Sequence, residues 1–140
     1  MPAFFPLIAA IMAMIASQII KLTTMVVSHK RLHWQSLTRP GGMPSSHAAL
    51  TTAIAMSMGL RHGFDSSFFF IGTVVAFVVI YDARGIRYAV GRHASVINHR
   101  LLPAMDPPLN EHVGHTIPQI IVGICIGILV PLGLYQYLHI

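Results

Sequence analysis

Residues 41–47 read GGMPSSH and stand directly before an apolar run that extends to Leu60. Pro44 suits the first turn of a helix, because its fixed φ is helical and its missing N–H is not needed there. Ser45 or Ser46 can cap that helix through a hydroxyl oxygen that accepts a free backbone N–H. The stretch therefore predicts a helix from Pro44 to Leu60 that begins immediately after a glycine-containing turn.

The same turn has the composition of an anion-binding site. The first N–H groups of a helix are unpaired and lie at the positive end of the helix dipole, so they favour an oxyanion such as phosphate. Gly41 and Gly42 let the backbone approach such a group closely, and His47 would stand beside it in the first turn. PSSH alone fits a plain helix cap with an incidental histidine equally well, so the interpretation depends on the rest of the chain.

The composition indicates an integral membrane protein. Of the 140 residues, 54% are hydrophobic and 9% are charged, and the mean hydropathy is +0.68. Soluble domains carry about 25% charged residues, so this chain has too few charges to cover a surface that faces water. Its length fits a single membrane domain over residues 1–140. The single cysteine, Cys125, excludes an intrachain disulfide.

Four apolar stretches approach the roughly 20 helical residues that cross a bilayer core. Helices are expected because isolated strands would leave their backbone groups unpaired in lipid. The predicted fold class is therefore all-α, a small bundle of about four transmembrane helices. The expected helices run from Ala3 to Val27, from Pro44 to Leu60, from Ser67 to Tyr81 and from Ile117 to Leu138.

Two polar connections, residues 28–43 and 82–116, fall on one side of the membrane in a four-span topology. They contain three and four lysines and arginines, against the single Arg61 in the short turn on the other side. By the positive-inside rule the basic side faces the cytoplasm and both termini lie outside. We therefore expect a multi-pass protein of a bacterial-type inner (plasma) membrane, with the active site on the cytoplasmic face.

An additional amphipathic helix is predicted inside the second connection. Apolar residues recur at helical spacing from Ile86 to Leu101, and Arg84 and Arg87 fall largely off that stripe. Such a helix lies in the headgroup region with its basic residues toward anionic lipid. A solvated connector helix is the alternative.

A second histidine repeats the arrangement around His47. Gly114, His115 and Thr116 open the last expected helix, with Pro118 in its first turn. The four-span topology puts the starts of the second and fourth helices on the same basic side. A histidine at a membrane interface is often only a polar anchor, but two that are matched in depth indicate a shared site.

An ionisable side chain also lies inside the first span. Lys21 stands about one and a half helical turns before that span enters the basic loop. An ionisable residue within a span indicates a functional site by default, and snorkelling of the ammonium group to the interface is the alternative. We therefore group Lys21 with the two histidines.

One set of motifs spans nearly the whole chain: Lys21, Arg39 before GGMPSSH, YDARGIR at 81–87, Asn98, and GHT at 114–116. Together they resemble the small divergent branch of the type 2 phosphatidic acid phosphatase superfamily, also labelled acid phosphatase/vanadium-dependent haloperoxidase-related. The resemblance covers about residues 17–134. It implies a metal-free phosphatase that needs no cofactor.

In that resemblance His115 is the nucleophile and His47 is the acid that protonates the leaving oxygen. Neutral imidazole is a competent nucleophile at phosphorus, and a second imidazole near its usual pKa of about 6.5 can give and take the proton. Positioning and electrostatics carry most of phosphoryl transfer, which suits a site made of cations and helix ends. The residues implied to bind the phosphate are Lys21, Arg39, Ser45, Ser46 and Arg87, with Gly42, Asp82, Asn98 and Glu111 in supporting positions.

The chain departs from the superfamily pattern at two positions. Gln119 stands where the pattern has a carboxylate that orients the nucleophile. Its carbonyl oxygen can accept the N–H of the His115 ring one turn earlier, but it cannot stabilise an imidazolium by charge. Leu109 stands where the pattern has an arginine. Arg39 or Arg87 can take that role, and Arg87 is favoured because it lies in the matching YDARGIR segment.

The remaining polar residues of the second connection allow two further expectations. Asp82 and Glu111 can each orient a histidine or pair with an arginine, and pairing is the expected role. The histidines in or beside this connection do not show the spacing of metal ligands, so no metal is expected. They are His93, His99, His112 and His115.

Two function classes fit these observations. The first is a membrane lipid phosphatase that hydrolyses a phosphomonoester or diphosphate of a phospholipid or polyprenyl carrier through a phosphohistidine. The second is a catalytically silent membrane protein that binds lipid phosphates. The net charge of +5 is accounted for by the membrane face and the phosphate pocket, so no nucleic-acid partner is expected. Gly123 and Gly127 form a GxxxG step that lets the last helix pack closely on a neighbour, either in the same chain or in a homo-oligomer.

Overall fold

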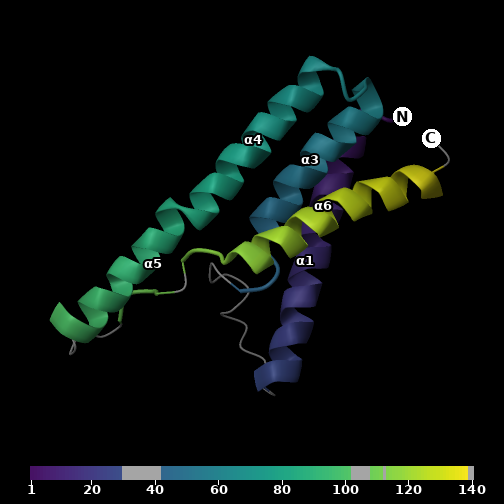
Figure 1. The fold of residues 1–140 in the computed structure, drawn as a ribbon. Coiled ribbons are helices and arrows are strands. Elements are labelled where there is room, and N and C mark those ends of the chain that lie inside the picture. The colour runs from purple at the N-terminus through teal and green to yellow at the C-terminus, as the bar shows by residue number, and fades with distance from the viewer. Residues whose placement is uncertain (30–41, 102–107, 112, 139–140) are drawn as a thin grey trace.

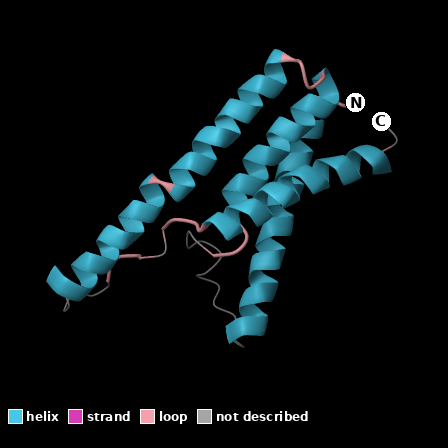
Figure 2. Cartoon of the chain, in the orientation of Figure 1, coloured by secondary structure: helices cyan, strands magenta, loops and turns pink. Residues whose placement is uncertain are grey.

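The computed structural model describes residues 1–29, 42–101, 108–111 and 113–138, and within these residues all regular structure is helical (Figure 2). The predicted all-α fold class is confirmed. The helices are α1 (Phe5–His29), α3 (Ser46–His62), α4 (Ser67–Arg84), α5 (Ile86–Val96), a π-helical turn η1 (Ile97–Leu101) and α6 (Ile117–Tyr137).

Helix α3 is the centre of the bundle. It packs against α1, α4 and α6, and α6 also packs against α1, which it crosses in Figure 1. Most of the buried hydrophobic residues are alanines, among them Ala9, Ala10, Ala13, Ala48, Ala49 and Ala53. Small side chains let helix backbones approach closely, which is how helices associate in a membrane.

The outer surface of α4 carries the large apolar side chains. Phe68, Phe70, Val74 and Phe77 are each more than half exposed. A soluble protein would bury most such residues, whereas in a bilayer they face the acyl chains. The bundle is therefore built with small residues inside and large apolar residues outside.

The GxxxG step of α6 is used within the chain. A Cβ added at Gly123 would lie 2.5 Å from the Ser45 carbonyl oxygen, and one at Gly127 would lie 2.6 Å from that of Ala49. Both glycines are therefore needed for the close approach of α6 to α3. The sequence allowed this face of α6 to pack on a helix of the same chain or of a second copy. In the structure it packs on α3 of the same chain.

Within the part of the chain that the structure describes, three helical segments are long and apolar enough to cross a membrane: residues 5–27, residues 67–100 and residues 117–137. Helix α3 has 17 residues and spans roughly 26 Å at 1.5 Å per residue, slightly less than a bilayer core of about 30 Å. The other helices pack around α3, so little of its surface is exposed, and a helix that is slightly too short for the bilayer core can be accommodated there.

The start of α3 differs from the prediction by two residues. Pro44 was expected in the first turn, but Ser45 is the N-cap, with φ −77° and ψ 109°, and its hydroxyl accepts the Ala48 N–H. Because Ser45 is extended and capping, the helix begins only at Ser46. Pro44 therefore precedes the cap and is buried.

The helix predicted inside the second connection is present as α5 and η1. It follows α4 after Gly85 and continues in nearly the same direction in Figure 1. Its buried residues are Gly91 and Ala94. This side of α5 packs on the segment that leads to α6, because a Cβ at Gly91 would overlap the Glu111 carbonyl oxygen.

The two ends of the bundle carry different parts of the chain. At one end an Arg61 Nη1–H donates to the Pro2 carbonyl oxygen at 2.8 Å, and both termini lie toward this end in Figure 1. At the other end the Ser45 N–H donates to the Gln119 carbonyl oxygen at 3.0 Å. The starts of α3 and α6 therefore meet, as the four-span topology requires.

Candidate active site

Three helix ends converge where the two predicted histidines lie. Besides the bond between Ser45 and Gln119, the His115 N–H donates to the Ala83 carbonyl oxygen at 3.1 Å. The start of α6 is thereby fixed to both the start of α3 and the end of α4. This convergence brings His47 and His115, which are far apart in sequence, close enough for the charge of one to act on the other.

His115 is buried, with 6% of its surface exposed, and stands just before the Thr116 N-cap of α6. Its Nδ1 lies 3.3 Å from Gln119 Oε1. The same oxygen accepts the Thr116 N–H at 3.0 Å, which holds the Gln119 side chain against the start of the helix. The predicted contact between Gln119 and the His115 ring is present.

This contact selects one tautomer of His115. A carbonyl oxygen only accepts hydrogen bonds, so the neutral ring facing Gln119 carries its proton on Nδ1 and leaves a lone pair on Nε2. The pKa of His115 is lowered, mainly because the ring is buried, and the charges of His47 and Lys21 lower it further. Hydrogen bonds with Gln119 and with the Gly42 backbone act in the opposite direction. The net effect is a neutral imidazole at neutral pH.

Lys21 lies on α1 beside this histidine and is 9% exposed. The backbone of Gly42 passes over its side chain, with a position for Cβ only 3.0 Å from Lys21 Cε. Gly42 also has φ +86°, a conformation that favours glycine. The positive φ therefore favours glycine at position 42, and a larger residue there would also crowd the end of the Lys21 side chain.

His47 is the second residue of α3 and is exposed. The charged groups that act on it most strongly are Arg87 and Asp82, at the end of α4 and the start of α5. Arg87 Nε donates to Asp82 Oδ2. The predicted pairing of Asp82 with an arginine is thus confirmed, and it holds the Arg87 side chain on the side of His47.

The serines before His47 have different positions. Ser45 is fully buried and its hydroxyl oxygen caps α3, while Ser46 is half-buried in the first helical position. Their predicted contact with phosphate stays a prediction. Arg39, the other predicted phosphate ligand, lies outside the described residues.

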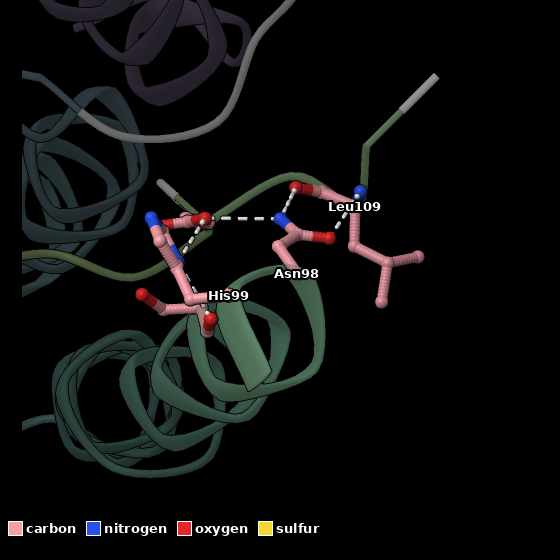
Figure 3. Close-up of polar contacts among 5 residues, drawn as sticks. Asn98, His99 and Leu109 are labelled. Carbon is pink, nitrogen blue, oxygen red and sulfur yellow. Dashed lines mark hydrogen bonds and ion pairs between the residues drawn. The ribbon is translucent and has the colours of Figure 1, made fainter. Parts of the chain in front are cut away.

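Asn98 connects η1 to the segment that carries His115 (Figure 3). Its Nδ2 donates to the Leu109 carbonyl oxygen at 2.8 Å and to Glu111 Oε1 at 2.9 Å, and its Oδ1 accepts the Leu109 N–H at 2.9 Å. His99 Nδ1 also lies 3.5 Å from Glu111 Oε1. The expected pairing of Glu111 with an arginine stays a prediction.

A cavity of about 300 Å³ lies beside Gln119, and three side chains of α5 that line it were not predicted for the site: Tyr88, Arg92 and Ser95. Their spacing of four and three residues puts them on one helix face. That periodicity was available in the sequence, but it does not reveal which face of α5 turns toward Gln119. Tyr88 also receives the Arg84 guanidinium over its ring, at 4.6 Å.

Comparison with known proteins agrees with this geometry. The sequence description of the Divergent PAP2 family matches residues 4–130. This chain belongs to the Divergent PAP2 family. It is also 35% identical to the uncharacterized membrane protein YuiD of Bacillus subtilis (strain 168), over 95% of each chain. No solved structure matches it.

Family membership establishes a membrane protein related to phosphatases. The match covers Lys21, both histidines and Gln119, so the whole candidate site lies inside the family segment. Within the part of the chain that the structure describes, no group of three or more His, Cys, Asp or Glu side chains is placed to hold a metal ion. Of the histidines weighed for such a site, His112 lies outside the described residues.

Proposed function

We propose that this protein is a membrane lipid phosphatase that hydrolyses a phosphomonoester or diphosphate of a phospholipid or polyprenyl carrier. The observation that carries the proposal is the buried His115 ring, whose Nδ1 faces Gln119 Oε1 at 3.3 Å. With Nδ1 on Gln119, Nε2 is the ring nitrogen that attacks phosphorus in this proposal. The lowered pKa of His115 keeps the lone pair of this nitrogen available at neutral pH.

The first chemical step forms a bond from His115 Nε2 to phosphorus and breaks the bond from phosphorus to the leaving oxygen. His47 gives its proton to that oxygen. In the second step water attacks the phosphohistidine, His47 takes the proton of the water, and inorganic phosphate leaves with His115 restored. Lys21 and Arg87 lie beside the two histidines, where their charges stabilise the phosphate oxygens in both steps.

A second candidate function is binding of lipid phosphates without turnover. It is favoured by Gln119, which accepts the ring N–H but lacks the charge to stabilise an imidazolium. The cations and the two helix starts would still bind a phosphate in such a protein.

Phosphate release by the purified protein, measured on a panel of lipid phosphates in detergent with and without a chelator, separates these candidates. We expect chelator-resistant release by the wild type and none by His115→Ala, which should still bind a phosphate analogue. His62→Ala is the matched control, because His62 is an exposed histidine at the opposite end of α3. Release by His115→Ala at the wild-type rate would contradict the mechanism, and binding without release by the wild type would favour the second candidate.

The proposed site faces the cytoplasm, with both termini outside. The support is the excess of lysines and arginines in the connections at the end of the bundle that carries His47 and His115. In a Cys125→Ala background, Arg100→Cys should resist an impermeant thiol reagent in intact cells, while Asp65→Cys, in the α3–α4 turn, should react. The opposite labelling would place the site on the outer face.

A further inference from the structure

The cavity beside Gln119 shares its walls with the surroundings of His115. Gln119 contacts the His115 ring, Gly114 and Thr116 flank it in the chain, and Gly42 contacts both Lys21 and His115. The opposite wall is the α5 face that contains Arg92 and Ser95. The cavity thus lies between residues that contact or flank His115 and three α5 side chains that sequence reasoning did not assign to the site.

Arg92 is the cation on that wall. Its side chain is exposed, and within the described ranges no carboxylate is paired with it. Arg87, by contrast, uses its Nε on Asp82. An arginine that lines a polar cavity with its donors available is suited to bind the oxygens of a phosphate group, which its planar guanidinium matches geometrically.

The position of Arg92 is fixed by backbone contacts. A Cβ at Gly91 would overlap the Glu111 carbonyl oxygen, and one at Gly114 would overlap the backbone of Tyr88. These contacts hold α5 against residues 111–114 and leave little freedom for α5 to turn about its axis. The backbone of Arg92 is therefore held beside the cavity, so its side chain lines the cavity without a movement of α5.

Leu109 does not line this cavity. Its backbone is bound on both sides by Asn98, and its side chain lines a separate cavity of about 340 Å³ with Val90, Ala94, Ile97 and Val113. The acidic residue in the walls of the cavity beside Gln119 is Glu111, and its carboxylate accepts a hydrogen bond from Asn98. The superfamily pattern has an arginine at the position of Leu109, but that position faces away from this cavity. Arg92 is the residue that supplies a positive charge to the cavity.

We propose that Arg92, with Ser95 beside it, forms a subsite for a phosphate group of the substrate in the cavity next to Gln119. This inference deepens the proposed function and rests on it for the identity of the substrate as a lipid phosphate. Arg92 is then a second arginine of α5 that binds the substrate, in addition to Arg87, which Asp82 holds near His47.

Binding is measured with purified full-length protein, with inorganic phosphate by calorimetry in one arm and phosphatidic acid in mixed micelles in the other. Arg92→Gln should weaken binding roughly ten- to a hundredfold, the contribution of one hydrogen bond between charged groups. Arg92→Lys should retain part of the affinity, because the charge stays and the planar fork is lost. Arg100→Gln is the matched control, since Arg100 is an exposed arginine of η1 that does not line the cavity.

A loss in both arms supports a subsite for the phosphate group itself, and a loss in the lipid arm alone supports one for the phosphate carried by the lipid. Equal affinity of Arg92→Gln and wild type in both arms overturns the inference, as does an equal loss in Arg100→Gln or a wild type that binds neither probe. Neither arm requires turnover. If the wild type binds through Arg92 but releases no phosphate, the proposed function fails and the subsite stands. If the wild type turns over lipid and Arg92→Gln binds both probes like the wild type, the subsite fails and the proposed function stands.

Discussion

Around α3 the helices contact one another through alanines and glycines, whereas the Asn98 side chain joins η1 to Leu109 and Glu111, and the Gln119 side chain holds His115, through hydrogen bonds. The first kind of contact depends on the volume of each residue and has no directional group. The second depends on the direction of individual donors and acceptors. A change of size should therefore damage the bundle, while a change of hydrogen bonding should damage the orientation of His115 and leave the bundle intact.

Among the residues that position His115, the largest effect on turnover is expected at Gln119. Gln119→Leu removes the acceptor for His115 Nδ1 and for the Thr116 N–H. Water can replace it at the exposed Thr116 N–H, whereas the loss of the oriented ring should raise the activation barrier by about 1–3 kcal/mol. We expect turnover to fall roughly ten- to a hundredfold, with the melting temperature changed little. Gln136→Leu, an exposed site near the end of the same helix, is the control. Unchanged turnover in Gln119→Leu would mean that another acceptor orients the ring.

A change of residue size inside the bundle should instead lower the stability of the protein. Gly127→Ala places a methyl group 2.6 Å from the Ala49 carbonyl oxygen, so α6 must move away from α3, and we expect a loss of about 1–3 kcal/mol in stability. Gly133→Ala is the matched control, because nothing lies within 4 Å of its added Cβ. Thermal unfolding in detergent measures the difference. Equal melting temperatures for the two variants would show that α6 does not need the close contact.

A smaller effect is expected at Asn98. Asn98→Ala removes three hydrogen bonds to Leu109 and Glu111, most of them exposed to solvent, so each is replaced partly by water. Turnover should fall severalfold, and amide exchange at Leu109 should accelerate, while the melting temperature stays near that of the wild type. A large drop in melting temperature instead would assign Asn98 to the stability of the whole fold.

The smallest change is a shift along the pH axis. Because burial lowers the pKa of His115, its neutral form persists below the usual pKa of about 6.5, and the acid limb of kcat/KM should lie below that value. Gln119→Glu places a carboxylate beside the ring, which favours the imidazolium and raises the pKa. Its acid limb should move to higher pH, and turnover can rise because the charged ring is stabilised. Identical pH profiles would show that residue 119 does not act on His115.

Short-range geometry explains which contacts of the site were predictable. Gln119 follows His115 by four residues at the start of α6, and Arg87 follows Asp82 by five across the break at Gly85, so the short separation in sequence keeps the members of each pair close together. The pairing of Glu111 with Asn98, by contrast, joins residues 13 apart across a turn. No periodicity in the sequence points to that partner.

The sequence by itself determined the membrane class, the helices and their approximate ends, and the two histidines at helix starts, because these follow from hydropathy, capping residues and helical spacing. Only the tertiary structure decided that Gly123 and Gly127 face α3, that Gly42 lies on Lys21, and that Arg92 opens into the cavity beside Gln119. Each of these depends on the rotation of a helix about its own axis or on the path of a loop. Packing between distant segments sets both, and it leaves no local pattern in the chain.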